Sequence, residues 1–198
     1  MFSVLAYCVG SISCAVLVCQ LAELPDPRTA GSQNPGTTNV LRLGGKKVAI
    51  ATLVGDALKG VVPVYIAMLI NPMPAFIGTV MVAVFLGHLY PVFFEFKGGK
   101  GVATAVGVLF ALSWPIGFMA LGTWLLIALC FRISSLAALA AAFLAPFYTW
   151  WWLNIQFAIP VLIMTLFIFW RHKENLKRII AKTEPKININ KKAEVQTP

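Results

Sequence analysis

The sequence predicts an all-α fold, a polytopic integral membrane bundle of about seven transmembrane helices, one of them short. Three observations lead to this prediction. Hydrophobic residues make up 59% of the chain, and the mean hydropathy is +0.82. Charged residues make up only 12%, against about 25% in soluble domains. Apolar runs alternate with polar connections along the 198 residues, a length that fits a single domain.

The apolar runs give the expected helices in chain order. About 20 residues, rising about 1.5 Å each, are needed to cross the hydrocarbon core. The expected spans are residues 2–22, 48–70, 74–94, 102–113, 115–131, 133–151 and 153–170. The fourth is too short to cross a full bilayer, so we expect a tucked or broken helix that its neighbours shield from lipid.

The basic residues indicate the orientation of these spans. Fifteen of the sixteen lysines and arginines follow the first, third, fifth or seventh span, whereas the alternate turns carry no charge. The positive-inside rule makes the basic face cytoplasmic, with the N-terminus outside and the C-terminus inside. The net charge of +9 is then explained by an anionic membrane face and anionic substrates rather than by nucleic acid.

Neither the two ends of the chain nor its cysteines indicate a catalytic role. The first 22 residues lack the positive n-region of a secretory signal, so we expect a retained helix. Residues 1–181 are expected to form one membrane-embedded domain, and residues 182–198 a basic, flexible cytoplasmic tail.

The cysteines lie inside apolar segments without the spacing of metal ligands, so we predict that they are packing residues. They are Cys8, Cys14, Cys19 and Cys130.

The connection after the third span carries the clearest functional signal. Residues 87–104 read GHLYPVFFEFKGGKGVAT, with glycines Gly98, Gly99 and Gly101 and lysines Lys97 and Lys100. Glycines leave backbone N–H groups uncovered, and a helix that starts near residue 102 would point its positive end at the same place. This pattern predicts a phosphate site, the alternative being a flexible hinge. His88, just before the loop, is either a hydrogen-bonded structural residue or a catalyst.

The first cytoplasmic connection, residues 26–47, is rich in Gly, Ser, Thr and Asn, which supply turns and hydrogen bonds. Arg28 and Arg42 add fixed cations. We expect a folded loop with an anion site, in which Ser32, Asn39 and Arg42 are the best polar contacts. The alternative is a solvated loop that merely follows the positive-inside rule.

Two charged residues lie inside the second span. Asp56 and Lys59 are three residues apart, a spacing that lets them pair on one helix face. Pairing is expected because an unpaired charge at mid-membrane costs about 3 kcal/mol. We expect a structural pair that also braces the site, with direct substrate contact as the alternative.

Two further polar groups follow the fifth and seventh spans. Arg132 stands beside two serines, and with Ser135 it forms a small anion-binding set, unless the serines only cap the next helix. In the run RHKENLKR, His172, Asn175 and Arg178 share a helix face. A histidine can accept a proton near neutral pH, and an amide can orient a hydroxyl or carbonyl. The alternative is a basic helix end that anchors on lipid.

The polar groups therefore lie on one membrane face and supply at least two cationic pockets and one candidate base, with neither a metal-ligand set nor Ser-His-Asp spacing. This combination indicates transfer between two phosphate-bearing molecules at the lipid boundary. It also resembles the bacterial acyl-phosphate:glycerol-3-phosphate acyltransferase family. The motifs that carry the resemblance are GSIS (10–13), GSQNPGTTNVLR (31–42), GDALKG (55–60), GHLYPVFFEFKGGKGVAT (87–104), RISS (132–135) and RHKENLKR (171–178).

The resemblance implies a seven-helix enzyme of the bacterial inner membrane whose catalytic loops face the cytoplasm. It would transfer a fatty acyl group from acyl phosphate to the 1-hydroxyl of glycerol 3-phosphate. The products would be lysophosphatidate and inorganic phosphate, in the first step of phospholipid synthesis. No cofactor and no metal are expected. The expected partners are the two substrates and membrane lipid, together with contact to the enzymes that make acyl phosphate.

The family's functional residues carry over by position. Ser32 and Arg42 match the essential polar residues of its first motif, and His172 and Asn175 match its active-site pair. Glu184 matches a structural acid that follows this pair.

The glycine loop also carries over, and the first loop shows two departures. Gly98, Gly99, Lys100 and Gly101 match the loop that binds phosphate in the family, which we assign to glycerol 3-phosphate. Gln33 stands where the family usually has glycine, and Thr37 where alanine is common. If position 33 needs a positive φ, Gln33 is strained there.

The chemistry of acyl phosphate agrees with these residues. It is a mixed anhydride with phosphate as a good leaving group, so no covalent enzyme nucleophile is required. Catalysis would come from holding two anions in register and from stabilising charge on the carbonyl oxygen and the departing phosphate. Lys100, Arg42 and Arg132 would screen the repulsion between the anions. Either His172 or a substrate phosphate would take the hydroxyl proton.

Other classes of protein fit less well. A transporter or flippase for an anionic solute would need polar residues across the membrane, not on one face only. A non-catalytic scaffold would leave the specialised loops unexplained. Acyltransferases that use acyl-CoA commonly carry Asp five residues after a histidine, but here Phe93 follows His88 and Lys177 follows His172 at that distance. The Asp-rich signature of metal-dependent phosphoalcohol transferases is missing.

Overall fold

The computed structural model describes residues 1–187, in which all regular secondary structure is helical and no β-strand occurs. The all-α fold class is therefore confirmed. The helices are α1 (Phe2–Gly10), α2 (Cys14–Leu21), α3 (Thr37–Ile70), α4 (Pro74–Leu89), the 3-10 turn η1 (Val92–Phe94), α5 (Val102–Leu112), α6 (Trp114–Phe131), α7 (Ser134–Trp152), α8 (Ile155–Arg171) and α9 (Lys173–Ile180).

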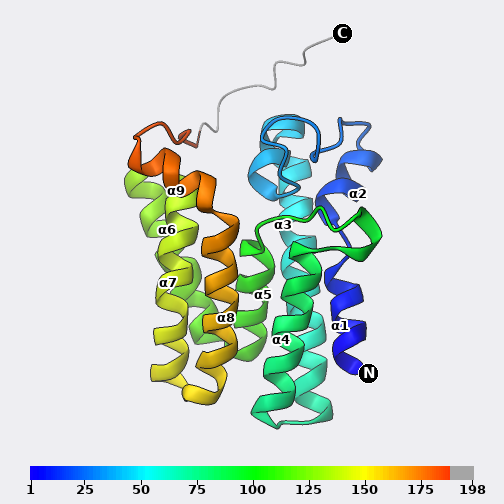
Figure 1. Cartoon of the computed structure of the whole chain (residues 1–198), viewed down its shortest axis with the longest axis vertical. Coiled ribbons are helices and arrows are strands. Elements are labelled where there is room, and N and C mark those ends of the chain that lie inside the picture. Colours follow the sequence, from blue (N-terminus) through cyan, green and yellow to red (C-terminus); the bar gives the residue numbers. More distant parts are fainter. Residues whose placement is uncertain (188–198) are drawn as a thin grey trace.

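Several of these helices have the length and composition of membrane spans. Three stretches qualify singly, namely α3, α4 with η1, and α6. The pairs α1–α2 and α8–α9, bent by 42° and 62°, qualify if each pair is one span. Figure 1 shows the long helices side by side, with the chain running back and forth between the two ends of the bundle. The expectation that seven segments cross stays a prediction.

The first expected span is not one continuous helix. It breaks between α1 and α2, where Ser13 takes an extended backbone conformation. The break frees the carbonyl oxygen of Ile12, and the Nζ atom of Lys59 on α3 donates a hydrogen bond to it at 2.7 Å. A side chain from another helix thus stabilises the break, and no local pattern within residues 2–22 reveals it.

The second expected span starts earlier than residue 48. α3 begins at Thr37 and passes through Gly45, which is not helical (φ +77°, ψ −168°). The last part of the first cytoplasmic connection is therefore helical, and it carries Asn39 and Arg42. Glycine adopts this positive φ without the steric cost that other residues have.

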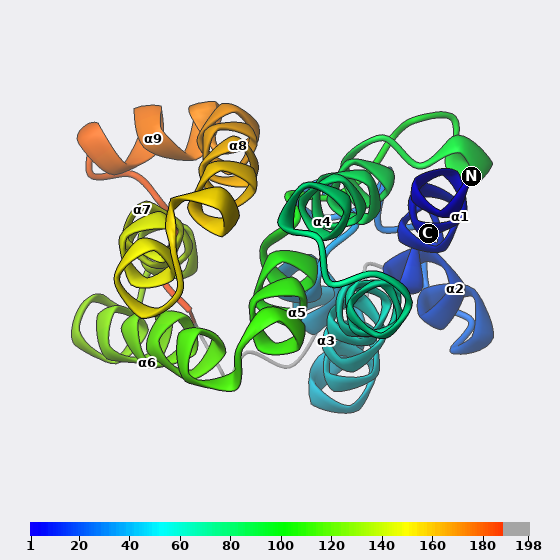
Figure 2. The same ribbon diagram turned by 90° about the horizontal axis from the view of Figure 1, so that it is seen from below.

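The bundle has two groups of helices around a shared core. Figure 2 shows α1 to α5 on one side and α6 to α9 on the other. The groups meet where α4 packs on α8 and α5 on α6. Phe85 and Met81 of α4, Ile116 of α6 and Met164 of α8 are fully or almost fully buried there. Many large apolar side chains on the outer surface are exposed, as suits helices that face lipid.

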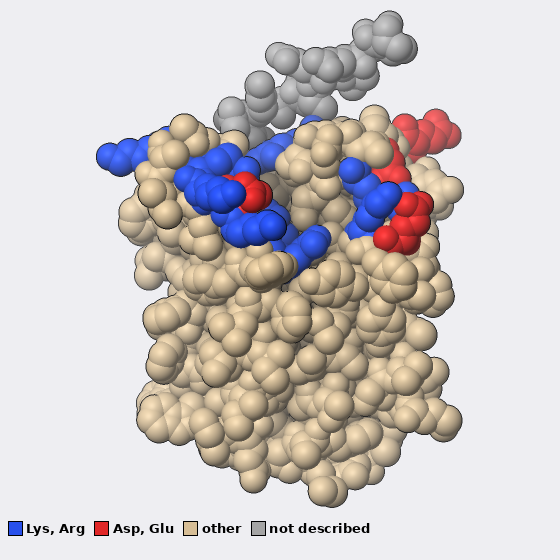
Figure 3. Space-filling view, in the orientation of Figure 1, with Lys and Arg blue, Asp and Glu red and all other residues tan. Residues whose placement is uncertain are grey.

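Charge gathers at one end of the bundle. Figure 3 shows the visible lysines and arginines at the end that carries the loops after α2, α4 and α9. The N-terminus lies at the opposite end (Figure 1). α3, α5 and α7 all begin at the charged end, so the positive ends of three helix dipoles lie on the basic face.

Candidate active site

The glycine loop lies against the end of α4 and leads into α5. The N–H of Gly99 donates a hydrogen bond to the carbonyl oxygen of His88 at 3.2 Å. A β-carbon on Gly99 would clash with Nε2 of His88 and lie 2.9 Å from the carbonyl oxygen of Pro35 in the first loop. Gly101 has φ +83° and stands at the N-cap of α5, with no side chain capping the helix. The N–H groups of the first turn of α5 therefore have no intrahelical partner, as an anion site requires.

A chain of hydrogen bonds connects this loop to α7 and α9. The Nζ atom of Lys100 donates to Oδ1 of Asn175, and the Asn175 amide nitrogen donates to Oε1 of Glu184 at 2.6 Å. The hydroxyl of Ser135 donates to the same Oε1 at 2.7 Å. Arg178 donates from Nε to Oε2 of Glu184 at 2.7 Å. Glu184 thus fixes the orientation of Asn175, which in turn holds the ammonium group of the glycine loop.

Burial and charge shift the pKa values of this network. Burial lowers the pKa of Lys100 to about 8; the charge of Glu184 opposes this shift, and those of Arg178, Arg171 and Arg42 add to it. Burial raises the pKa of Glu184, but hydrogen bonds from its neighbours outweigh that effect and hold it below the ordinary value. Glu184 is therefore ionised at neutral pH, and Lys100 is mostly a cation that loses its proton easily.

His172 stands at the bend between α8 and α9 and is 3% exposed. Its Nδ1 lies 2.8 Å from the carbonyl oxygen of Ile168. A carbonyl can only accept, so Nδ1 carries the proton and Nε2 keeps a lone pair. Burial and the positive charge of Lys100 lower the pKa of His172 to about 4, so the imidazole is neutral at pH 7. A neutral imidazole with a free Nε2 can accept a proton.

Asn39 does not serve the role expected for it in the first loop. It is 1% exposed, and its Oδ1 accepts a hydrogen bond from the N–H of Ser32 at 2.8 Å. Its amide nitrogen donates to the carbonyl oxygens of Pro27 and Ala30, both at 3.0 Å. Asn39 thus folds the loop and has no donor left for a phosphate. Ser32 is exposed on this loop, with its hydroxyl in no hydrogen bond to residues 1–187.

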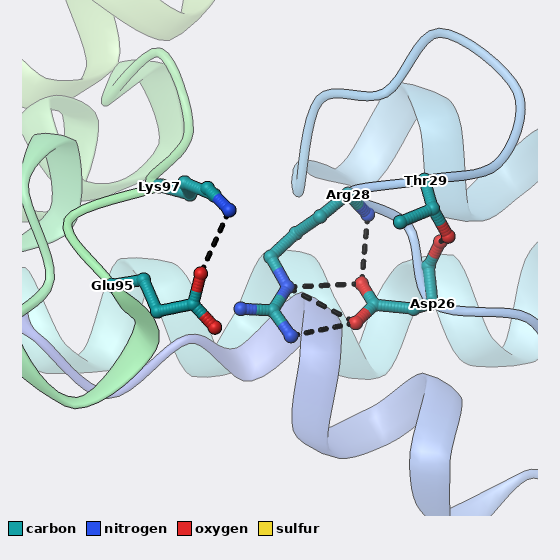
Figure 4. Close-up of polar contacts among 5 residues, drawn as sticks. All are labelled: Asp26, Arg28, Thr29, Glu95 and Lys97. Carbon is teal, nitrogen blue, oxygen red and sulfur yellow. Dashed lines mark hydrogen bonds and ion pairs between the residues drawn. The ribbon is translucent and has the colours of Figure 1, made fainter.

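Two other loop cations, Arg28 and Lys97, form ion pairs with neighbouring carboxylates. Arg28 binds Asp26 through both oxygens, the shortest contact being 2.7 Å (Figure 4). Lys97 is paired with Glu95 at 2.7 Å in the neighbouring loop (Figure 4). Arg28 is thus a cation fixed in the first loop, with its charge balanced by Asp26. Arg42 and Arg132 are exposed, and neither donates a side-chain hydrogen bond to residues 1–187.

The expected pair inside α3 is confirmed and belongs to a larger buried group. Nζ of Lys59 lies 2.8 Å from Oδ1 of Asp56. Nδ1 of His88 lies 3.7 Å from the same oxygen and 3.2 Å from the hydroxyl of Thr104 on α5. The group runs from the α1–α2 break to the residue that lies beneath Gly99. That it braces the site remains a prediction.

A small apolar cavity of about 30 Å³ lies between α5, α6, α7 and α8. Val102, which lines it, directly follows the glycine loop, and Ile168, which also lines it, binds His172 through its carbonyl oxygen. Alanines of α7, including Ala138 and Ala142, form much of its wall. The cavity thus begins beside the polar network and extends into the bundle. Its lining is apolar, as suits a hydrocarbon chain, but its volume is well below that of a small-molecule pocket.

The remaining expected residues occupy supporting positions. The hydroxyl of Ser135 donates to Glu184 and does not cap α7, and the phosphate contact expected of Ser135 stays a prediction. The stretch after α9, expected to be flexible, begins with contacts: the N–H of Ile187 donates to the carbonyl oxygen of Arg132 at 2.7 Å. Most of the expected tail, residues 188–198, lies outside the described residues.

Within residues 1–187 no group of His, Cys, Asp and Glu could hold a metal ion.

Sequence reasoning missed Arg171, the last residue of α8. Its Nη2 donates to the carbonyl oxygen of Gly98 at 2.7 Å, and its Nε donates to that of Gly99 at 3.2 Å. A signal for it existed, because Arg171 directly precedes His172 where an apolar span ends. That signal does not distinguish it from the other basic residues of the same run.

Comparison with known proteins assigns this arrangement to a family. Residues 1–182 match the family model described as glycerol-3-phosphate acyltransferase. The glycerol-3-phosphate acyltransferase of Methylococcus capsulatus is 52% identical over 187 residues, 94% of each chain. That of Vibrio cholerae is 50% identical over 189 residues, 96% of this chain and 90% of the relative.

Solved structures agree in fold. The crystal structure of PlsY (YgiH), an integral membrane glycerol 3-phosphate acyltransferase, is similar in its glycerol 3-phosphate form, with a TM-score of 0.91 and 35% identity over 94% of each chain. Its lysophosphatidic acid form gives a TM-score of 0.89 and 34% identity, over 95% of this chain and 94% of that one. The apolar helices and these neighbours make the protein a multi-pass membrane protein. The match over residues 1–182 and the 52% identity show that the chain belongs to the glycerol-3-phosphate acyltransferase family.

Proposed function

We propose that this protein transfers a fatty acyl group from acyl phosphate to the 1-hydroxyl of glycerol 3-phosphate, as the first step of phospholipid synthesis. The products are lysophosphatidate and inorganic phosphate. The observation that carries the proposal is the junction of the Lys100–Asn175–Glu184 network, His172 and the apolar cavity. The forms of the PlsY structures, with glycerol 3-phosphate and with lysophosphatidic acid, support the acceptor and the product.

The phosphate of glycerol 3-phosphate binds at the glycine loop in this proposal. The uncovered N–H groups at the start of α5 and the ammonium of Lys100 favour a dianion there. The second phosphate, on the acyl donor, is held by Arg42 and Arg132 together with Ser32. These arginines are exposed, so they are free to turn toward a ligand. Because two anions repel, holding both beside fixed cations is the main contribution of the site.

The transfer itself needs one proton acceptor. The glycerol hydroxyl oxygen attacks the acyl carbonyl carbon, the bond from that carbon to the phosphate oxygen breaks, and phosphate leaves with the bonding electrons. We assign the hydroxyl proton to Nε2 of His172, whose lone pair is kept by the hydrogen bond from Nδ1 to Ile168. A bound phosphate raises the pKa of His172, because a nearby negative charge favours the imidazolium form.

The acyl chain of the donor enters between α5 and α8 along the residues that line the small apolar cavity, and the helices must separate there to admit it. The cavity starts at Val102, so the reacting carbonyl would lie near the glycine loop while the chain lies among the alanines of α7. Burial of each methylene there contributes about 0.8 kcal/mol to binding. We place the protein in the bacterial inner membrane with this site at the cytoplasmic face, as the basic end suggests.

The proposal is tested on the detergent-purified protein by the leaving group of each donor, which is phosphate for palmitoyl phosphate and the free thiol of coenzyme A for palmitoyl-CoA. The donors are palmitoyl phosphate and, in parallel, palmitoyl-CoA, each with and without glycerol 3-phosphate. Phosphate release from palmitoyl phosphate that depends on glycerol 3-phosphate, with no transfer from palmitoyl-CoA, is the expected result. Folded protein that transfers nothing from either donor would refute the proposed reaction, and transfer from palmitoyl-CoA alone would refute the donor.

A further inference from the structure

Arg171 links the end of α8 to the glycine loop through two hydrogen bonds. It donates to the carbonyl oxygens of Gly98 and Gly99 at 2.7 and 3.2 Å. We propose that Arg171 is a positioning residue that sets the backbone of the glycine loop for phosphate, rather than a contact of the substrate. This inference rests on the proposed function, in which the loop binds the phosphate of glycerol 3-phosphate.

The hydrogen bonds of Arg171 determine which way the loop N–H groups point. In a trans peptide the C=O and the following N–H point in opposite directions. The carbonyl of Gly98 faces Arg171, and the N–H of Gly99 accordingly faces the carbonyl oxygen of His88 on α4. The carbonyl of Gly99 also faces Arg171, so the N–H of Lys100 points away from it. Arg171 and α4 thus form hydrogen bonds to opposite sides of the loop. The N–H groups that follow, from Lys100 into the first turn of α5, remain available to bind an anion.

The guanidinium group is suited to this task in a way that an ammonium is not. Its planar fork binds two acceptors at fixed positions, whereas lysine offers one compact charge. The carbon of the guanidinium lies 5.9 Å from the centre of the Tyr90 ring, which supports it by a cation–π contact. The carbonyl oxygen of Tyr90 accepts a hydrogen bond from the hydroxyl of Tyr7 on α1 at 2.5 Å. Tyr90, which contacts the guanidinium group, is therefore itself held to α1.

Arg171 differs in its hydrogen bonding from Arg42 and Arg132, two other arginines of the basic face. Arg42 and Arg132 make no side-chain hydrogen bond to residues 1–187 and remain free for an anion. Arg171 already gives two of its donors to the loop carbonyls. Its neighbour Lys173 is exposed, with Nζ 5.4 Å from the Trp170 ring centre, and donates no side-chain hydrogen bond to the glycine loop. Lys173 is thus a matched control for removal of a nearby positive charge.

The first test is Arg171→Lys, which keeps the charge and loses the fork. Palmitoyl phosphate is held constant and glycerol 3-phosphate is varied. We expect the KM for glycerol 3-phosphate to rise about tenfold, equivalent to one charge-assisted hydrogen bond, while the unfolding midpoint in detergent stays unchanged. Lys173→Gln should leave KM unchanged. A wild-type KM in Arg171→Lys would mean that only the charge matters, and would overturn the positioning role.

The second test is chemical rescue of Arg171→Ala. Guanidinium ion at millimolar concentration should restore part of the lost activity, and ammonium ion should not, because only guanidinium can bridge the two carbonyls. Equal effects of the two ions would overturn the inference. If Arg171→Ala does not fold, Arg171→Lys decides alone. Inactivity of the wild-type protein in the same assay would count against the proposed function, whereas an active wild type with an unaltered Arg171→Lys would count against the positioning role only.

Discussion

The Nζ atom of Lys100 donates a hydrogen bond to Oδ1 of Asn175, although the two residues are 75 positions apart in the chain. The bond joins the loop before α5 to α9. The amide nitrogen of Asn175 donates to Glu184, so both polar atoms of this side chain have an assigned partner. An amide can accept from a cation and donate to an anion at once, which a carboxylate cannot do.

Asn175→Asp should lower turnover at least about tenfold, because an oxygen in place of the amide nitrogen would face the Glu184 carboxylate and repel it. Turnover with palmitoyl phosphate is measured beside the unfolding midpoint. Asn154→Asp is the matched control: Asn154 caps α8 through its side-chain oxygen, and aspartate caps a helix equally well. Equal activities of the two variants would show that the amide of Asn175 has no special role.

Activity should fall as pH rises through about 8, because the pKa of Lys100 is lowered to about 8 and only its charged form holds phosphate. The charge of Glu184 raises that pKa, so Glu184→Gln should move the alkaline limb of kcat/KM to lower pH. Glu174→Gln is the control, since Glu174 is exposed and pairs with Lys177 on the surface. An alkaline limb at the same pH in Glu184→Gln and in the wild type would exclude Lys100 as its source.

His172→Ala should lower kcat by about 10²- to 10⁴-fold, the usual contribution of a general base. The protein should still accumulate in the membrane, since among residues 1–187 the imidazole makes a single hydrogen bond, to the backbone of Ile168. Turnover is measured on protein quantified after purification. Turnover equal to that of the wild type would remove His172 from the site and leave a substrate phosphate as the base.

Gly99→Ala should raise the KM for glycerol 3-phosphate, because the added methyl group would clash with His88 and push the loop out of place. Initial rates at varied glycerol 3-phosphate give the KM. Gly122→Ala on α6 is the control, since a β-carbon there meets no atom within 4 Å. If Gly99→Ala keeps the wild-type KM, the phosphate of glycerol 3-phosphate belongs with Ser32 and Arg42 instead.

Gln33→Gly should raise the free energy of unfolding by about 1 kcal/mol, because Gln33 has φ +56°, a conformation that glycine adopts without strain. The shift of the thermal unfolding midpoint in detergent reports it. Gln20→Gly is the matched control on the exposed side of α2, where glycine weakens a helix by about 1 kcal/mol. A lowered midpoint for both variants would mean that position 33 is not strained.

The helix pattern could be predicted because apolar runs and basic connections are local features. The expected span at 115–131 agrees with Trp114–Phe131, and that at 102–113 with Val102–Leu112. The sequence raised the condition of a positive φ at Gln33 without predicting it, and the structure meets that condition with φ +56°. The α1–α2 break could not be predicted, because the donor that stabilises it comes from Lys59 on another helix.

The site was predictable in its residue types but not in its connections. Glycine, lysine and histidine at those positions indicated phosphate chemistry, and no local pattern shows that Glu184 reaches Ser135 across 49 positions. Asn39 looked like a ligand because it lies among turn residues, whereas its amide is used inside its own loop. A polar side chain can fold a loop or bind a substrate, and only the three-dimensional contacts distinguish the two.

The hydrogen bond from Lys59 to the carbonyl oxygen of Ile12 also bears on how the chain enters the bilayer. An isolated charge at mid-membrane costs about 3 kcal/mol, and an unwound backbone in lipid leaves a carbonyl without a partner. Asp56 offsets the charge of Lys59 within α3 itself, so the dependence runs mainly one way: the break between α1 and α2 needs α3 to supply a donor. We therefore expect α1, α2 and α3 to leave the translocon together. The buried pair of Asp56 and Lys59, which lies beneath the site, would then also influence the order in which the helices enter the bilayer.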